Sequence, residues 1–332
     1  MKLSKKGLSA ITIIGILSVA LFFTYRYMKD REEDTNNKYQ LIYIPKTQDK
    51  ANDFWTSLLE GTQEAADEYQ VDLKVVSPAS EDDYEGQKEL ILEAIEERPD
   101  AILISPCRYI EETETARKVK EAGIKLILID SFLNEHIEDA AVTTDNTEAG
   151  TKMGEYAKEF LIGDVEPVIG IISHVKGSST AFDREEGLRL GLGSYSDHIV
   201  GRVYSNSTYE EAFDVTVELL KKNPDINLIF GLNEYSSVGA ARAIREMGLS
   251  EQVKMVGFDS SKEEIRLLEE GVFSAIIIQE PFVMGYLGVE KAVQVVNGEN
   301  SSEKVDSGSI IITKENMYTE ENQKLLFPFW DK

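Results

Sequence analysis

The chain has 332 residues, of which 60 are Asp or Glu and 35 are Lys or Arg, so its formal net charge is -25 at pH 7. Phosphate binding needs a concentrated basic surface, so this charge balance argues against a nucleic-acid partner. The one cysteine, Cys107, excludes an internal disulfide and a cysteine zinc cluster, and the 3 histidines show no metal-binding spacing. No GxxxxGK or GxGxxG loop occurs, so we expect neither a metal nor a cofactor.

An apolar run near the start of the chain predicts a membrane anchor. Residues 8–25 contain no charged side chain, and Lys2, Lys5 and Lys6 precede them. About 18 apolar residues are just enough to cross a hydrocarbon core of ~30 Å. The alternative is a signal peptide cleaved after Ala20, but the apolar run continues past that position, which disfavours cleavage. We therefore predict a single-pass transmembrane helix, with residues 1–37 as anchor and linker.

Beyond the linker, short apolar strands alternate with helical patterns. In chain order the expected strands are 39–45, 71–76, 101–104, 124–129, 141–144, 168–172, 200–204, 228–230, 255–258, 273–278 and 310–312. Helices are expected between them, one of them capped by Ser80 or Asp82, while residues 177–184 are expected to form a loop. This alternation predicts an α/β fold with parallel sheets covered by helices, and its restart near residue 147 predicts two similar lobes.

Polar residues stand where many of these strands end. Strand 228–230 is followed by Asn233, and strand 255–258 by Asp259. Asn and Asp at such positions are common helix caps and turn residues, which is the simpler explanation for either one alone. Because parallel strands end at one edge of a sheet, where ligands bind, the pair also predicts a shared crevice.

The same reasoning gives a set of candidate ligand-binding residues at or beyond strand ends. They are Asn52, Phe54, Trp55, Ser105, Asp130, Arg184, Tyr209, Asn233, Asp259 and Gln279. Charged and amide groups make directional hydrogen bonds to hydroxyls, and flat aromatic rings suit the C–H faces of a pyranose. Three alternatives stay open at this point: core packing for the aromatic rings, a turn role for Asp130, and a surface ion pair for Arg184.

Several segments, taken together, resemble those of type I periplasmic sugar-binding proteins, in particular the ribose and xylose group. They are NDFW with LLEG, ILISP, LILID, TTDNTEAG, DREEGL, NPDINLIFGLNE, VGFD and IIIQEP, spread over residues 39–313. The resemblance implies two Rossmann-like lobes with parallel sheets, joined by a three-segment hinge. The first lobe would comprise residues 38–144 and 280–306, and the second residues 145–279 and 307–332.

The resemblance also implies roles for individual residues. Phe54 and Trp55 would sandwich a sugar, with Tyr209 stacking from the other lobe. Hydroxyl binders would be Asn52 and Asp130 in the first lobe, and Arg184, Asn233, Asp259 and Gln279 in the second lobe and hinge. Asp145 would be a hinge residue, with the crossings near Asp145, Gln279 and Asp306.

Two positions depart from the ribose-type pattern. Ser105 stands where an Asn is usual, and Ser131 where an Arg is usual. Both changes remove contacts to hydroxyls, so they point away from ribose and towards another pentose, such as xylose, or a hexose. The Asp-rich calcium loop of galactose receptors is absent, which again predicts no metal.

The anchor resembles that of membrane-tethered sugar sensors that work beside a sensor histidine kinase. We therefore expect an extracytoplasmic monosaccharide receptor that closes on its sugar and signals to such a kinase. The alternative is the substrate-binding component of a sugar ABC transporter with a permease partner, and a furanosyl autoinducer receptor is less favoured. An enzyme is not expected, because the sequence shows no nucleophile–base constellation. A transcription regulator would need a helix-turn-helix where the apolar run lies.

Overall fold

The computed structural model describes residues 38–163, 165–299 and 304–327. In that part of the chain, every helix is too short or too polar to span a lipid bilayer. The transmembrane helix predicted at residues 8–25 lies outside the described residues, so it stays a prediction.

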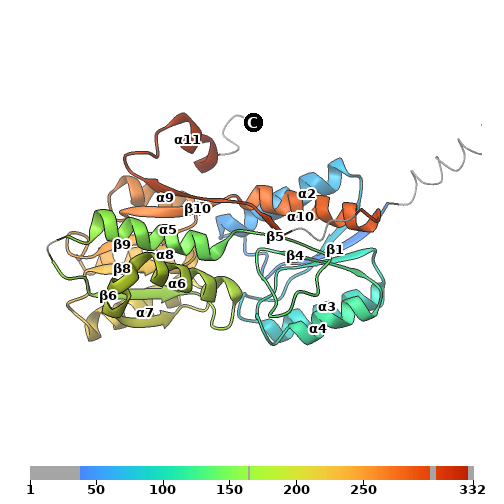
Figure 1. Cartoon of the computed structure of the whole chain (residues 1–332), viewed down its shortest axis with the longest axis horizontal. Helices are drawn as coiled ribbons and strands as arrows, with labels where there is room; N and C mark the ends of the chain where they lie inside the picture. The colour runs from blue at the N-terminus through green and yellow to red at the C-terminus, as the bar shows by residue number, and fades with distance from the viewer. Residues whose placement is uncertain (1–37, 164, 300–303, 328–332) are drawn as a thin grey trace, which may run out of the picture. The chain divides into compact units, whose positions relative to one another are not determined.

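The first sheet is six-stranded and entirely parallel, in the order β11-β5-β4-β3-β1-β2 (Figure 1). Its strands are β1 (Gln40–Ile44), β2 (Asp72–Val75), β3 (Ala101–Ile104), β4 (Lys125–Ile129), β5 (Ala140–Thr143) and β11 (Lys304–Asp306). Its helices are α2 (Asp53–Glu68), α3 (Tyr84–Glu97), α4 (Thr113–Glu121) and α10 (Pro281–Val296). Helices α2 and α10 cover one face and α3 and α4 the other. The central strands are short apolar runs because both faces of this sheet are covered.

The second sheet is also six-stranded, in the order β12-β10-β9-β8-β6-β7, and only β12 runs antiparallel. Its strands are β6 (Ile169–Ser173), β7 (Ile199–Tyr204), β8 (Leu228–Gly231), β9 (Lys254–Phe258), β10 (Ala275–Gln279) and β12 (Ser309–Thr313). Its helices are α5 (Asn146–Tyr156), α6 (Ser179–Leu192), α7 (Tyr209–Lys222), α8 (Glu234–Glu246), α9 (Lys262–Glu269) and α11 (Glu320–Leu326), with the short π-helix η1 (Ala157–Leu161) and the 3₁₀-helix η2 (Gly193–His198). One core lies under α5 and α6, and the other under α7, α8, α9 and α11.

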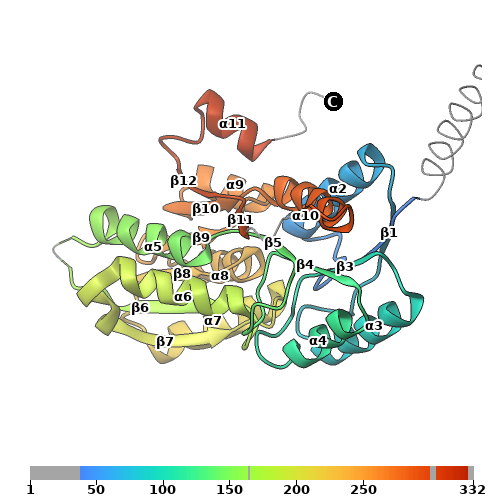
Figure 2. The same ribbon diagram turned by 45° about the vertical axis from the view of Figure 1, so that its right-hand side comes forward.

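The chain passes between the two sheets after β5, after β10 and after β11 (Figures 1 and 2). Side chains tie these crossings together. The Thr144 hydroxyl donates to Gln279 Oε1 at 2.8 Å, and the Asp145 backbone N–H donates to Asp306 Oδ1 at 2.9 Å. Thr144 also lies 3.2 Å from the Ser307 hydroxyl. The predicted fold class, two α/β lobes with parallel sheets and three connections, is therefore confirmed.

The structure corrects the expected elements at three places. Helix α6 begins at Ser179, so most of the loop predicted at residues 177–184 is helical. The turn before this helix contains Gly177, whose φ is 91°. Helix α3 is capped by Asp83, whose side chain accepts from the Gly86 N–H, and not by Ser80 or Asp82. Strand β11 and helix α11 were not predicted, because both are short and β11 has one apolar residue.

Glycines let pairs of helices cross in close contact. In the second lobe, a Cβ added at Gly187 of α6 would lie 2.0 Å from the Thr147 carbonyl oxygen at α5. In the first lobe, a Cβ at Gly61 of α2 would lie 2.0 Å from the Phe282 carbonyl oxygen of α10. Backbone atoms cannot rotate away as a side chain can, so these glycines are required by packing.

We expect Gly187→Ala to lower the free energy of unfolding by about 1–3 kcal/mol, as overpacked cores do. Helix propensity alone favours Ala over Gly by ~1 kcal/mol, so the expected sign is set by the clash. Urea unfolding of both proteins measures the difference. Gly163→Ala is the control, because a Cβ there meets nothing within 4 Å. An equally stable or more stable Gly187→Ala variant would show that α5 and α6 can separate without cost.

Candidate functional site

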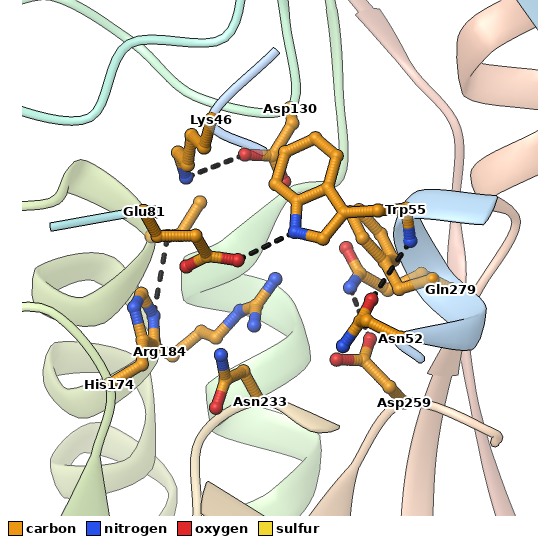
Figure 3. A pocket seen from close by; sticks show the side chains of 12 residues that line it. Lys46, Asn52, Trp55, Glu81, Asp130, His174, Arg184, Asn233, Asp259 and Gln279 are labelled. Carbon is orange, nitrogen blue, oxygen red and sulfur yellow. Dashed lines mark hydrogen bonds and ion pairs between the residues drawn. The ribbon is translucent and has the colours of Figure 1, made fainter. Parts of the chain in front are cut away.

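A pocket with an empty volume of about 290 Å³ lies between the carboxyl edges of the two sheets (Figure 3). Its lining comprises Lys46, Asn52, Phe54, Trp55, Glu81, Asp130, His174, Thr180, Arg184, Asn233, Asp259 and Gln279. The structure thus brings together most of the predicted site residues. Of the predicted set, Ser105 and Tyr209 do not line the pocket, whereas Lys46, Glu81, His174 and Thr180 line it without having been predicted.

Asn52 and Asn233 are helix caps and pocket residues at the same time. Asn52 Oδ1 accepts from the Trp55 N–H at 2.9 Å and caps α2, while Asn233 Oδ1 accepts from the Ser236 N–H at 2.9 Å and caps α8. The cap hydrogen bond holds each side chain in one orientation at the pocket wall. Asn233 thus caps its helix and faces the crevice predicted for it, and Asn52 combines the same two positions in the first lobe.

Asp130 and Asp259 occupy equivalent positions in the two lobes. They follow β4 and β9, the third strand from the same end of each sheet, and both have positive φ, 69° and 87°. Asp tolerates this region better than most residues, although it costs free energy. Asp130 pairs with Lys46 Nζ at 2.7 Å, and both side chains are 4% exposed. Asp259 accepts from Gln279 Nε2 at 2.6 Å and from the Glu234 backbone N–H at 2.8 Å.

The aromatic wall of the pocket is held by a carboxylate. Trp55 is 2% exposed, and its indole N–H donates to Glu81 Oε1 at 2.6 Å. The other oxygen, Oε2, accepts from the Ser207 hydroxyl of the second lobe at 2.6 Å. Burial raises the pKa of Glu81, and the charge of Lys46 and both hydrogen bonds oppose that rise. The Phe54 ring meets Trp55 edge to face, with centroids 5.1 Å apart, so Glu81 and Phe54 together fix the indole plane.

Arg184 is buried and held from three sides. Its Nε donates to Asn146 Oδ1 and its Nη1 to the Leu232 carbonyl oxygen, both at 2.7 Å. Its guanidinium lies 3.8 Å from the centroid of the Phe258 ring. Beside it, burial lowers the pKa of His174 well below its ordinary value, so that imidazole is neutral at pH 7. The lining therefore offers fixed charges of both signs and a neutral imidazole.

The predicted residues that do not line the pocket have other contacts. Ser105 is fully buried and its hydroxyl lies 2.8 Å from the Tyr43 hydroxyl. Tyr209 opens α7, and its ring packs on Tyr235 with centroids 4.8 Å apart, so it does not face Trp55 across the pocket. Asp145 lies at a crossing and caps α5 by accepting from the Glu148 N–H at 2.9 Å.

The residues missed by the sequence differ in how easily they could have been found. Lys46 comes two positions after β1, so the strand-end rule that selected Asp130 would also have selected it. Glu81 stands in an acidic loop, SEDDYEG, where no pattern distinguishes one carboxylate from the next. His174 directly follows β6, so the strand-end rule would have selected it as well.

We expect Lys46→Met to lower the free energy of unfolding by about 3–5 kcal/mol, because it leaves the buried Asp130 carboxylate unpaired. The double variant Lys46→Met/Asp130→Asn should recover part of this loss, since no unpaired charge remains buried. Denaturant unfolding at pH 7 measures all three proteins. Lys50→Met, an exposed lysine of the same loop, is the control. A single variant as stable as this control would mean that water reaches Asp130.

Comparison with known proteins finds similar sugar-binding proteins. The D-ribose/D-allose-binding protein of Pseudomonas aeruginosa is 26% identical over 227 residues, which cover 66% of this chain and 70% of that protein. The ribose import binding protein of Escherichia coli is 26% identical over 215 residues, which cover 64% of this chain and 71% of that protein. Among solved structures, a sugar transporter from Clostridium phytofermentans is 47% identical with a TM-score of 0.79, covering 84% of this chain and 100% of that one.

A second solved structure is a carbohydrate transporter solute binding protein from Agrobacterium radiobacter, in complex with D-arabinose. It is 26% identical, with a TM-score of 0.81, and the match covers 87% of this chain and 99% of that one. The family model described as a periplasmic binding protein domain matches residues 43–300, most of the chain. The chain therefore belongs to the periplasmic binding protein family and has its two-lobed type I fold.

Proposed function

We propose that the chain is the solute-binding component of a sugar ABC transporter, an extracytoplasmic receptor that delivers a monosaccharide to a permease. The observation that carries this proposal is the pocket itself. An aromatic wall from the first lobe and charged hydrogen-bonding groups from both lobes converge on one small volume. We take the lobes as residues 38–144 with 280–306, and 145–279 with 307–332. The family relatives described above support the same function.

The pocket suits a small neutral polyol. Its lining consists mostly of polar and charged side chains, with Phe54 and Trp55 as the aromatic part. The carboxylates Glu81, Asp130 and Asp259 accept hydrogen bonds from hydroxyls, and Lys46 and Arg184 donate to hydroxyl oxygens. The flat indole of Trp55 provides a surface for the C–H face of a pyranose. We therefore propose a pentose or hexose in its pyranose form.

Closure of the lobes around the ligand follows from which residues line the pocket. Trp55, Glu81 and Asp130 belong to the first lobe and Arg184, Asn233 and Asp259 to the second, so only the closed form allows both groups to contact one sugar. A ligand that binds the closed form better shifts the population towards it. A permease can then distinguish loaded from empty receptors by the relative position of the lobes.

A second function, sugar sensing, is favoured by one observation, the apolar run at residues 8–25. As a membrane anchor, it would keep the receptor beside a membrane partner, and a sensor histidine kinase would read the same closure. Co-purification of the full chain from membranes distinguishes the two functions. Recovery of a permease supports transport, and recovery of a histidine kinase supports sensing.

We expect one monosaccharide of a panel to bind saturably to the full chain. The panel contains D-ribose, D-allose, D-arabinose, D-fucose, D-xylose and D-glucose, with the furanosyl autoinducer as the competing class. Trp55 and Trp330 are the two tryptophans of the chain, so binding against the Trp55 face should change the fluorescence. Calorimetry on the same samples gives the affinity. If neither fluorescence nor calorimetry detects binding of any sugar in the panel, the proposed function is contradicted.

Asp259→Asn should weaken that binding roughly 10- to 150-fold, because a hydrogen bond to a charged acceptor contributes about 1.5–3 kcal/mol. Asn is chosen because it tolerates the positive φ at this position. Asp225→Asn, on an exposed turn of the same lobe, should bind like the wild type. Equal affinity of the two variants would remove Asp259 from the ligand site.

A further inference from the structure

A buried carboxylate of the second lobe caps a helix of the first lobe. Glu234 opens α8 and is 2% exposed. Its Oε2 accepts from the Phe54 N–H at 3.1 Å and its Oε1 from the Asp53 N–H at 3.3 Å, both at the start of α2. Those backbone groups have no partner within their own helix, and they form its positive end. Glu234 therefore provides a contact between the lobes that needs no ligand.

The Tyr209 hydroxyl joins this contact, and it faces two oxygen atoms with a single proton to donate. It lies 3.2 Å from the Ala51 carbonyl oxygen and within hydrogen-bond distance of Glu234 Oε1. A phenol carries one proton, and both of these neighbours are acceptors when Glu234 is ionised. A proton on Glu234 satisfies all three groups, because Glu234 then donates to Tyr209 and Tyr209 donates to Ala51.

We propose that lobe closure takes up a proton on Glu234, so that Glu234, Tyr209 and the backbone of residues 51–54 form a proton-linked latch. The latch deepens the proposed function, on which its biological role rests, because it regulates the same site. Asn52 and Phe54 line the pocket and belong to the segment that the latch holds. Glu234 is thus a positioning residue, which acts on the ligand through Asn52 and Phe54.

The surroundings of Glu234 are predominantly acidic. Asp259 at the end of β9 and Glu264 of α9 both interact with it electrostatically, and Asp49 and Asp53 of the first lobe lie beside the latch. Arg242 of α8 lies 5.2 Å from the centroid of the Tyr209 ring but is paired with Glu263. Arg184 opposes the rise that burial causes in the pKa of Asp259. The net field therefore disfavours a further negative charge.

Burial, followed by the charge of Asp259, raises the pKa of Glu234 to about 8, although Tyr209 and the α2 N–H groups oppose the rise. In an open form the side chain would be hydrated and the burial that raises its pKa would be lost, while Asp259 and Glu264 would stay beside it in the same lobe. The pKa is thus higher in the closed form, so closure is most favoured below the open-form value. The ratio of closed to open molecules falls by up to tenfold per pH unit between the open-form pKa and about 8, and the contribution of the proton is lost above about 8.

Distance measurements on the unliganded full chain test the latch. Nitroxides are placed at Glu89→Cys on α3 and Glu218→Cys on α7, both exposed and on the side of the molecule away from α10 (Figures 1 and 2). The native Cys107 is buried and stays unlabelled. Pulsed electron–electron double resonance then measures the distance between the two nitroxides, and the distance distribution gives the fraction of closed molecules. We expect the ratio of closed to open molecules to be at least tenfold higher at pH 6 than at pH 9.

In Glu234→Gln the amide replaces the protonated carboxyl and donates to Tyr209, at the cost of the longer contact to Asp53. We expect the closed fraction of this variant to be the same at pH 6 and pH 9. Glu210→Gln, an exposed neighbour of Tyr209 on α7, should keep the wild-type pH dependence.

Two results would overturn the latch. One is a wild-type closed fraction that does not change with pH. The other is an undiminished pH dependence in Glu234→Gln, which would assign the proton to Asp259 or Glu264. The measurement contains no sugar, so a failure of the proposed function leaves its outcome intact. Conversely, sugar binding without any pH-dependent closure would reject the latch alone.

Discussion

The carboxylate of Asp259 is where the hinge, the pocket and the contact between the lobes meet. One of its oxygens accepts from Gln279, whose own oxygen accepts from Thr144 at the first crossing. The other accepts from the backbone N–H of Glu234, the residue whose side chain reaches α2 of the other lobe. Burial raises the pKa of Asp259, and the nearby Arg184 guanidinium opposes that rise. A change at this carboxylate therefore reaches the crossings and the cleft together.

Much of the fold could be predicted because its strands are short, apolar and followed by polar turns. The parallel pairing required no further information, since a strand–helix–strand alternation leaves few alternatives. The errors fall where the pattern is too short to detect. Strand β11 contributes only Val305 as an apolar residue, and α6 starts inside a polar stretch that resembles a loop.

The site was predicted less completely than the fold, and the reason is geometric. Strand ends give the position of a side chain along the sheet edge, so Asn52, Asp130, Asn233 and Asp259 could be predicted to converge. The direction in which a long side chain leaves a loop is set by tertiary contacts. Tyr209 was assigned to the pocket because it lies beyond a strand end, and the resemblance gave it a stacking role, but its ring lies on Tyr235. Glu81 was not selected, although its two hydrogen bonds orient Trp55 and bridge the lobes.

The positive φ angles at Asp130 and Asp259 divide the pocket into two classes of position. At these two sites, and at the capping residues Asn52 and Asn233, the backbone itself restricts which amino acids can replace the native one. Lys46 and Glu81 carry no such backbone constraint, because they stand in loops of ordinary conformation. Exchanges at Lys46 and Glu81 are therefore limited by their side-chain partners Asp130, Trp55 and Ser207, and not by the backbone. Two different constraints, backbone conformation and side-chain pairing, therefore decide which substitutions the two classes of position accept.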